Sequence, residues 1–246
     1  MSSDKPPPRS LDLVWARPDR PRAGLRPALS RDQIVRSAIE LADSEGIAAL
    51  SIRKLATRLG AGAMSLYWYV ASKDDLIDLL LDAVYGEADL PQHPSGDWRS
   101  DLGDVARGTR VLMHRHPWIA ALVGNRALLG PNALRRIDYS LATLDPIGVD
   151  VSTMMGLLGA INAYVTGFVL NELGEAETRR RTGLSDEEFR LSAAPYVQEQ
   201  VIASGRYPHL ARYVTEGEDR DADAEFAFGL NCLLDGIAAF KATSRS

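Results

Sequence analysis

Residues 50–82 read LSIRKLATRLGAGAMSLYWYVASKDDLIDLLLD, and this stretch decides the fold. Apolar residues recur at helical spacing over residues 51–59, the glycine-rich turn at residues 60–62 ends that helix, and a second, short helix is expected over residues 63–69. Glycines at both ends of the turn allow a sharp change of direction without a Cβ clash. The pattern is typical of a helix-turn-helix, whose second helix is presented outward, although a hairpin in any helical bundle has the same spacing.

The sequence on either side also predicts helices. Ser30 and Gln33 form a capping box for a helix that ends at Gly46, and Ser72 caps a longer helix that continues to residue 89. No alternating apolar and polar run predicts a strand. Further helices are expected over residues 97–115, 117–123, 131–144, 151–178, 186–203 and 222–241. We therefore expect an all-α fold.

Charge is distributed unevenly along the chain. The net charge of −5 argues, taken as a whole, against a nucleic-acid partner. Residues 1–73 carry +5, however, and residues 74–246 carry −10. A basic N-terminal part on an acidic body predicts a binding surface at one end. The single cysteine, Cys232, excludes a disulfide framework and a multi-cysteine metal site.

Residues 1–29 contain six prolines and five arginines. Because so many prolines exclude a helix, a flexible, extended arm is expected there. Two interpretations stay open: a disordered tail, or a basic arm that follows a phosphate backbone or enters a minor groove.

Residues 151–171 carry no charge over 21 residues, which is long enough to span a bilayer. Their serine, threonine, asparagine and glycine residues, and the lack of basic or aromatic flanks on both sides, favour a helix buried in a bundle or dimer core. The helix expected over residues 222–241 carries an apolar stripe made of Phe226, Leu230, Leu233, Ile237 and Phe240. We expect a homodimer through these two helices and no membrane.

The short helix over residues 63–69 combines a core position with polar and aromatic side chains. If Leu66 faces the core, the side chains around it cannot all be buried as well. Hydroxyl-bearing and aromatic side chains in such a place can bond to phosphate or pack on a thymine methyl. Arg53 and Lys73, together with the Ser51 hydroxyl beside a helix N-terminus, suit phosphate groups. The opposing interpretation, in which Tyr67 and Trp68 are core residues, stays open.

Residues 30–89 resemble the DNA-binding domain of the TetR family of bacterial regulators. The resemblance rests on RDQIVRSAIELADSEGIAAL (31–50) and on the stretch over residues 50–82, in which LYWYV (66–70) is close to the tetracycline repressor. It implies that residues 63–69 form the recognition helix. We predict DNA contacts for Ser51, Arg53, Ala63, Met64, Ser65, Tyr67, Trp68, Tyr69 and Lys73. Residues 61–64 lack side-chain hydrogen-bonding groups, so direct base readout is expected to rest on few residues.

Residues 97–241 resemble, more weakly, the tetracycline-repressor type of C-terminal domain, through Asp97-Trp98-Arg99, His116-Pro117-Trp118 and Gly130-Pro131-Asn132. The resemblance places an effector pocket in this body. Positions that hold tetracycline in the family fall on Val105 and Thr109, and the magnesium-binding histidine falls at Val123, so a tetracycline–magnesium ligand is not expected. We expect no metal and no cofactor, and a small, largely apolar effector.

Helical spacing and the need for an apolar wall with a few polar groups suggest the pocket residues. They are Val105, Thr109, Met113, His116, Ile137, Leu141, Met155, Leu158 and Asn162. The alternative for most of these side chains is that they are simply core. His116 and Asn162 are the expected orienting groups.

The sequence predicts a ligand-responsive, sequence-specific repressor that is cytoplasmic, dimeric and released from double-stranded DNA by its effector. Its expected parts are the arm (1–29), a helix-turn-helix domain (30–90) and a ligand-binding and dimerisation domain (97–246). Two alternatives are an all-α small-molecule enzyme and a regulator that acts through protein contacts. The four histidines form no metal-ligand pair on one helix face, and no phosphate loop or nucleophile elbow is present, so an enzyme is not expected.

Overall fold

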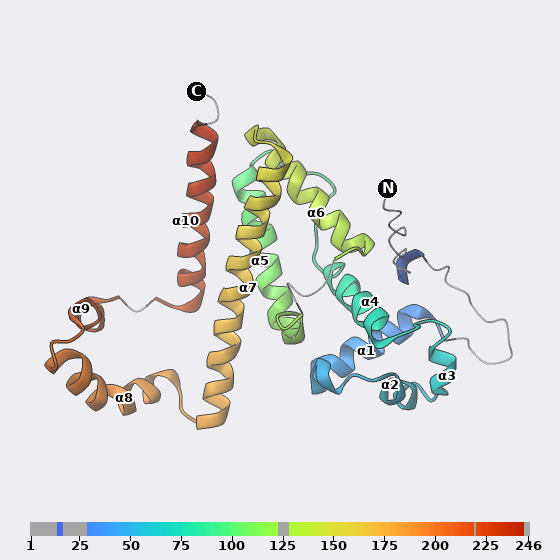
Figure 1. The fold of residues 1–246 in the computed structure, drawn as a ribbon, viewed down its shortest axis with the longest axis horizontal. Coiled ribbons are helices and arrows are strands. Elements are labelled where there is room, and N and C mark those ends of the chain that lie inside the picture. The colour runs from blue at the N-terminus through green and yellow to red at the C-terminus, as the bar shows by residue number, and fades with distance from the viewer. Residues whose placement is uncertain (1–13, 17–28, 123–127, 219, 244–246) are drawn as a thin grey trace, which may run out of the picture. The chain divides into compact units, whose positions relative to one another are not determined.

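The computed structural model describes residues 14–16, 29–122, 128–218 and 220–243 of the chain (Figure 1). Every regular element in these ranges is a helix, which confirms the all-α prediction. The predicted arm over residues 1–29 lies almost entirely outside the described residues, as does Val123. The chain divides into two compact units, residues 1–146 and residues 147–246, which are described in turn.

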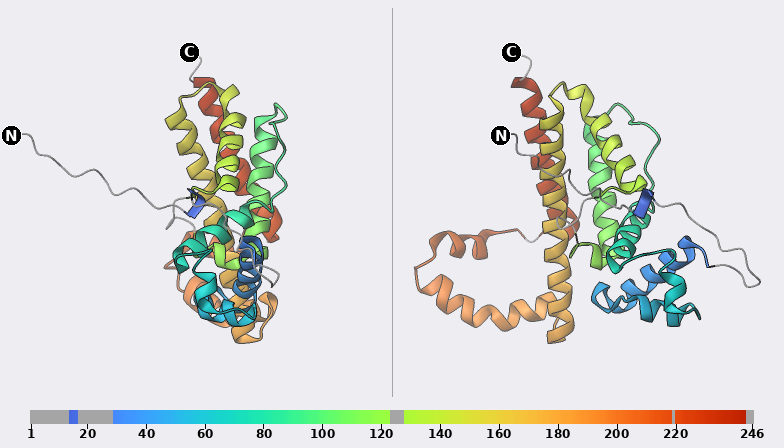
Figure 2. Two further views of the ribbon diagram at one scale, coloured as in Figure 1. Left: turned by 90° about the vertical axis from the view of Figure 1, so that its right-hand side faces the viewer. Right: turned by 45° about the vertical axis from the view of Figure 1, so that its right-hand side comes forward.

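The first unit begins with the predicted three-helix head. In chain order it contains a 3-10 turn η1 (Val14–Ala16), α1 (Arg31–Glu45), a 3-10 turn η2 (Ile47–Ala49), α2 (Ile52–Arg58), α3 (Ala63–Leu66), α4 (Lys73–Tyr85), α5 (Trp98–Arg115), a 3-10 turn η3 (Pro117–Ile119), α6 (Pro131–Leu144) and a 3-10 turn η4 (Asp145–Ile147). Helix α4 contacts both α1 and α6, so one helix adjoins the head and the body of this unit (Figure 2).

The helix ends follow from local hydrogen bonding. Ser30 Oγ accepts from the backbone N–H of Gln33 at 3.1 Å, and the Gln33 side chain accepts from the backbone N–H of Ser30 at 3.0 Å. Ser72 caps α4 in the same sense, with its Oγ 3.0 Å from the Asp75 nitrogen. These bonds satisfy N–H groups that have no partner inside the helix. The predicted starts of α1 and α4 are confirmed.

The core of the head is a set of leucine and isoleucine side chains. Ile34 and Leu41 of α1, Leu55 of α2, Leu66 of α3 and Leu76 of α4 are each at most 1% exposed. Burying side chains of this size stabilises a fold by about 1.5–3 kcal/mol each relative to leaving them in water. The short helices α2 and α3 are therefore held mainly by this core, because helices of their length are not stable alone.

The helix predicted over residues 117–123 is wrong in its extent. Only the 3-10 turn η3 forms there, followed by a turn over residues 120–122. Pro117 starts it, and Trp118 and Ile119 turn inward, with Trp118 Nε1 donating to Asp43 Oδ1 at 2.7 Å. A longer helix would carry these side chains away from their buried sites.

The second unit is built on two long helices. It contains α7 (Val151–Thr182), α8 (Asp186–Val197), a π-helical turn η5 (Gln198–Ala203), α9 (Pro208–Glu216) and α10 (Ala222–Thr243). Helix α7 extends past the predicted end at residue 178, and α9 is not predicted from the sequence at all. Tyr164 of α7 donates to the Phe226 carbonyl at 2.8 Å and stacks on its ring, so α7 and α10 lie side by side (Figure 2).

Candidate functional site

The head presents one face of α3 to solvent. Leu66 and Val70 are fully buried, whereas Met64 is 74%, Trp68 73% and Tyr67 47% exposed. The turn after α3 keeps helical geometry, because Val70 N donates to the Leu66 carbonyl at 3.0 Å. The structure thus favours the exposed interpretation of Tyr67 and Trp68 over the core interpretation.

The remaining predicted contact residues lie around this face. Ser51 is the N-cap of α2, with its Oγ accepting from the Lys54 nitrogen at 3.2 Å, and its hydroxyl proton is free to be donated elsewhere. Ala63, Ser65 and Tyr69 are half-buried. Helix α3 itself is shorter than the predicted range of 63–69, because residues 67–69 form a turn.

The basic side chains of α2 and of the start of α4 fall into two groups. Lys54 pairs with Glu45, and Arg58 Nη2 lies 2.9 Å from Glu40 Oε2, so both cations are already neutralised by α1. Arg53 and Lys73 are exposed, and neither has an ion-pair partner among the residues that the structure describes. Arg53 and Lys73 are therefore available to phosphate groups.

The turn between α2 and α3 depends on one of its two glycines. Gly60 has φ +63°, a left-handed conformation that side chains disfavour. Gly62 has φ −77°, and a Cβ there would approach nothing closer than Ser65 Oγ at 3.8 Å. Gly60 is thus the glycine whose conformation the turn requires, whereas Gly62 adopts a conformation that is open to other residues.

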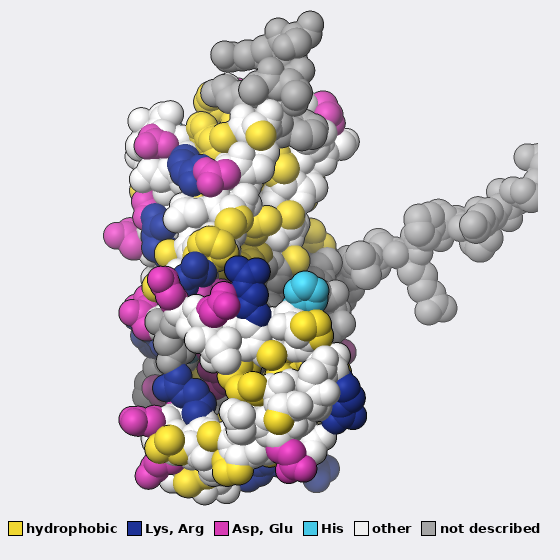
Figure 3. Space-filling model, turned by 90° about the vertical axis from the view of Figure 1, so that its left-hand side faces the viewer, with side chains coloured by type: hydrophobic (Ala, Val, Ile, Leu, Met, Phe, Trp, Pro, Cys, Tyr) yellow, Lys and Arg dark blue, Asp and Glu magenta, His cyan; other side chains and the backbone are white. Residues whose placement is uncertain are grey.

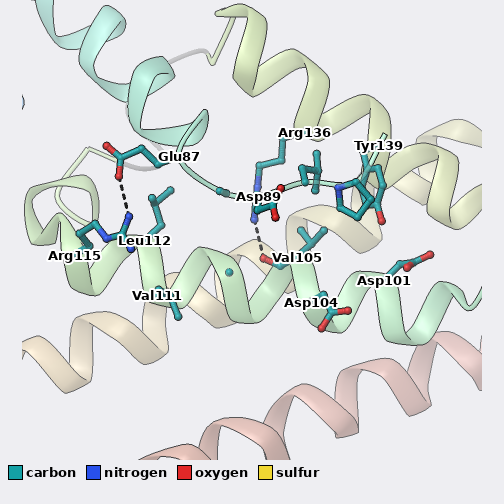
Figure 4. A pocket seen from close by; sticks show the side chains of 14 residues that line it. Glu87, Asp89, Asp101, Asp104, Val105, Val111, Leu112, Arg115, Arg136 and Tyr139 are labelled. Carbon is teal, nitrogen blue, oxygen red and sulfur yellow. Dashed lines mark hydrogen bonds and ion pairs between the residues drawn. The ribbon is translucent and has the colours of Figure 1, made fainter. Parts of the chain in front are cut away.

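A cavity of about 250 Å³ lies in the first unit, between α5, α6 and the segment that follows α4 (Figure 4). Its wall combines apolar side chains with six charged ones. The lining residues are Glu87, Ala88, Asp89, Leu90, Pro91, Asp101, Asp104, Val105, Gly108, Val111, Leu112, Arg115, Arg136 and Tyr139. Its volume is slightly below the usual range of small-molecule pockets.

The structure brings few of the predicted ligand residues to this cavity. Val105 lines it. Thr109 is buried behind it and donates to the Val105 carbonyl at 2.7 Å, and Met113 is buried. Ile137 and Leu141 are half-buried on α6 but do not line it. In the second unit, Leu158 is buried, whereas Met155 and Asn162 are exposed.

His116, predicted to orient the ligand, is bonded elsewhere. Its Nδ1 lies 2.7 Å from Asp43 Oδ1, and its Nε2 lies 3.1 Å from Glu87 Oε2. The ring is buried and does not line the cavity. His116 therefore joins the end of α5 to α1 of the head and to the segment after α4. The predicted role of His116 in orienting a ligand in this cavity is not supported by its position.

Sequence reasoning missed Arg136 and Tyr139. Both lie one helical turn apart on α6, with Tyr139 buried and Arg136 half-buried. Arg136 Nη2 donates to the Val105 carbonyl at 2.7 Å and to Thr109 Oγ1. Burial lowers the pKa of the Arg136 guanidinium and raises the pKa of the Tyr139 phenol. The sequence feature that could have identified them is a pair of polar residues spaced i, i+3 on the buried face of α6. A search for apolar neighbours does not select such a pair.

Known protein families match both the head and the body of this chain. A family model described as "Bacterial regulatory proteins, tetR family" matches residues 34–80, and one described as "Tetracyclin repressor-like, C-terminal domain" matches residues 90–240. The "HTH-type transcriptional repressor DrrR1" of Streptomyces coeruleorubidus is 39% identical over 238 residues, which cover 96% of this chain and 87% of DrrR1.

Solved structures show the same architecture. Apo ActR from Streptomyces coelicolor has a TM-score of 0.73 at 26% identity and covers 90% of this chain and 100% of its own. ActR in complex with actinorhodin has a TM-score of 0.72 at 27% identity, with 87% and 98% covered. The fold and the exposed α3 define a helix-turn-helix transcriptional regulator. The chain belongs to the TetR family of bacterial regulatory proteins.

Proposed function

We propose that this regulator is a cytoplasmic, homodimeric repressor that binds a double-stranded operator through α3 and leaves it when a small effector enters the body. The observation that carries the proposal is the exposure of Met64, Tyr67 and Trp68 on a helix whose inner side chains are fully buried. Large apolar side chains so exposed on a head with free cations are suited to groove edges and phosphates.

The proposed DNA contacts divide into two kinds. Arg53, Lys73 and the Ser51 hydroxyl bind phosphates and fix the register of the head. Residues of α3 and the turn after it reach base edges in the major groove: Ala63, Met64, Ser65, Tyr67, Trp68 and Tyr69. Because this set is poor in hydrogen-bonding groups, thymine methyl contacts contribute to sequence preference.

Helix-turn-helix dimers place their two recognition helices in successive major grooves on one face of the DNA, about 34 Å apart. We propose that this chain binds in the same way and therefore forms a dimer. Helix α7 is long and apolar enough to cross a membrane, a property that core helices of soluble proteins share, and 28% of its most apolar window is buried within this single chain. Val151, Met155 and Leu170 on α7 and Phe228 on α10 are about half exposed or more. We propose that a second copy covers residues 151–171 and 222–241 in place of lipid.

A chain of hydrogen bonds from the cavity wall to the head couples effector binding to DNA binding. Glu87 lines the cavity and bonds to His116, which in turn bonds to Asp43 on α1. An effector that moves the segment after α4 therefore also moves a partner of the head. Release requires that the effector binds the DNA-incompatible arrangement more tightly than the competent one.

The functional division that we propose follows the two activities: a DNA-binding domain over residues 30–90 and a ligand-binding and dimerisation domain over residues 97–246, with the arm over 1–29 before them. The chain acts by binding and needs no catalytic residues or cofactor. A regulator acting only through protein contacts is the second candidate, but no observation favours it.

A gel-shift titration with the DNA upstream of the chain's own gene tests this function. We expect a retarded complex that unlabelled upstream DNA displaces and that an equal mass of unrelated DNA does not. Displacement by both competitors alike would contradict sequence-specific binding.

A further inference from the structure

The cavity beside α5 and α6 contains a cation, Arg136, that has no carboxylate partner among the described residues. Arg136 points from α6 toward the backbone of α5 (Figure 4). Its hydrogen-bond partners are both neutral, the carbonyl of Val105 and the hydroxyl of Thr109. Among the residues that the structure describes, no carboxylate lies within 4.0 Å of it. A half-buried guanidinium without a carboxylate partner loses solvation and gains little in return.

None of the acidic side chains of the cavity wall forms an ion pair with Arg136. Glu87 Oε2 lies 3.1 Å from Arg115 Nη1, and Asp104 Oδ1 accepts from Arg107 Nη2 at 2.8 Å. Asp101 Oδ2 accepts from the backbone N–H of Ser95 at 2.8 Å. Asp89 is exposed to water. None of the four carboxylates of the wall therefore lies within ion-pair distance of Arg136.

The rest of the wall is suited to a flat or branched apolar body. Val105, Val111 and Leu112 of α5 face the cavity across from the segment after α4. A guanidinium has five N–H donors, so two neutral bonds leave donors available for a second acceptor. A carboxylate takes two parallel bonds from such a fork, which are stronger than bonds between neutral groups.

We propose that this pocket binds a small organic acid whose apolar body lies against Val105, Val111 and Leu112 and whose carboxylate pairs with Arg136. The proposal rests on the effector-responsive function above and narrows the expected largely apolar effector to an apolar molecule with one acidic group. It also gives the acid a direct route to the head, because the same cavity is lined by Glu87, the partner of His116.

The test uses three probes of one shape and different charge: 2-naphthoate, 2-naphthamide and 2-naphthylmethylammonium. Each is titrated into the full-length protein by calorimetry. We expect the acid to bind about tenfold or more tightly than the amide, since hydrogen bonds to a charged group are stronger than hydrogen bonds between neutral groups. Equal affinities, tightest binding by the amine, or no binding of any probe at millimolar concentration would overturn the proposal.

Variants assign the preference to one residue. Arg136→Met retains a long apolar side chain, and we expect it to bind acid and amide equally. Arg136→Lys retains the charge without the planar fork and should keep part of the preference. Arg180→Met is the matched control, because Arg180 is exposed at the end of α7 and paired with Glu177. A full preference for the acid in Arg136→Met would overturn the assignment.

The test stays decisive if Arg136→Met does not fold, and it separates the acid preference from DNA binding. The three-probe comparison in the unaltered protein and the lysine variant decide the question even if circular dichroism shows that Arg136→Met does not fold. Operator binding in the gel shift needs no effector, so a failure of the acid preference leaves the proposed DNA-binding function standing, and a failure of the gel shift is seen separately.

Discussion

His116 Nδ1 lies 2.7 Å from Asp43 Oδ1, and this contact joins residues that are 73 positions apart in the sequence. The same Asp43 oxygen accepts from Trp118 Nε1 at 2.7 Å. The end of α5 and the turn η3 are thus tied to α1, and through Glu87 to the segment that lines the cavity. One carboxylate is the shared acceptor of this junction.

Removing that acceptor should weaken the first unit. In Asp43→Ala, the buried His116 and Trp118 lose their shared partner, and we expect the free energy of unfolding to fall by about 1–3 kcal/mol. Asp43→Asn keeps one acceptor oxygen and should lose less. Urea unfolding followed by circular dichroism measures both. An Asp43→Ala midpoint equal to that of the unaltered protein would show that the junction contributes no stability.

The two glycines of the α2–α3 turn should differ in their tolerance of a side chain. Gly60→Ala places a Cβ in the left-handed region and should cost about 1–2 kcal/mol of stability. Gly62→Ala meets only Ser65 Oγ at 3.8 Å and should change stability by no more than about 0.5 kcal/mol. Thermal unfolding compares them directly, and the reverse order would contradict the geometry of the turn.

Asp82 should act as a cap supplied by another helix. Its Oδ1 accepts from the Ala133 nitrogen at 2.9 Å at the start of α6, where the N-cap Gly130 has no side chain to do so. Burial raises the pKa of the Asp82 carboxyl above its ordinary 3.8. Asp82→Ala should therefore lose about 1 kcal/mol, whereas Asp82→Asn keeps an acceptor without a buried charge.

The raised pKa of Asp82 predicts how the stabilities of the unaltered protein and of Asp82→Asn depend on pH. The favourable contribution of the protonated carboxyl is fully present below pH 3.8 and is lost as pH rises through the folded-state pKa. The stability of Asp82→Asn relative to the unaltered protein should therefore increase from acid to neutral pH. A difference that is constant with pH in urea titrations would contradict the assigned burial.

Operator affinity should fall steeply with salt, because phosphate contacts release counterions. Arg53→Ala and Lys73→Ala should each reduce the slope of log affinity against log salt by about 1. Lys54→Ala serves as the control, since Lys54 is already paired with Glu45 and should change the slope less. A slope that is flat, or equally reduced by all three variants, would contradict the division of the head's cations.

Local features of this fold follow from the sequence, and distant ones do not. Capping boxes such as Ser30 with Gln33 act over three residues, so the helix starts are predictable. The partner of His116 is 73 residues away, and its choice depends on how α5 meets α1. Arg136 was missed because a pocket search guided by apolar spacing ignores a cation held by a carbonyl. Helix α9 was missed because none of its residues is buried, so no core pattern marks it.

The exposed apolar surface of the second unit is another feature that the sequence did not predict. Large apolar side chains of α8 and α9 are exposed: Phe189, Leu191, Tyr196, Leu210 and Tyr213. Figure 3 shows hydrophobic side chains at the surface of one face of the molecule. A pattern of apolar residues predicts burial inside the chain, and these side chains are not buried there. This segment therefore could not be assigned a packing partner from its own sequence.

Operator titration of Tyr67→Ala is the direct test of whether the exposed face of α3 binds DNA. Tyr67 is 47% exposed, so its loss should leave the fold and the dimer intact, which size-exclusion chromatography checks. We expect operator affinity to fall about tenfold or more, as for loss of a groove contact of 1–3 kcal/mol. Tyr196→Ala, at an exposed tyrosine outside the head, should bind as the unaltered protein does. Unchanged operator affinity in Tyr67→Ala would contradict the account.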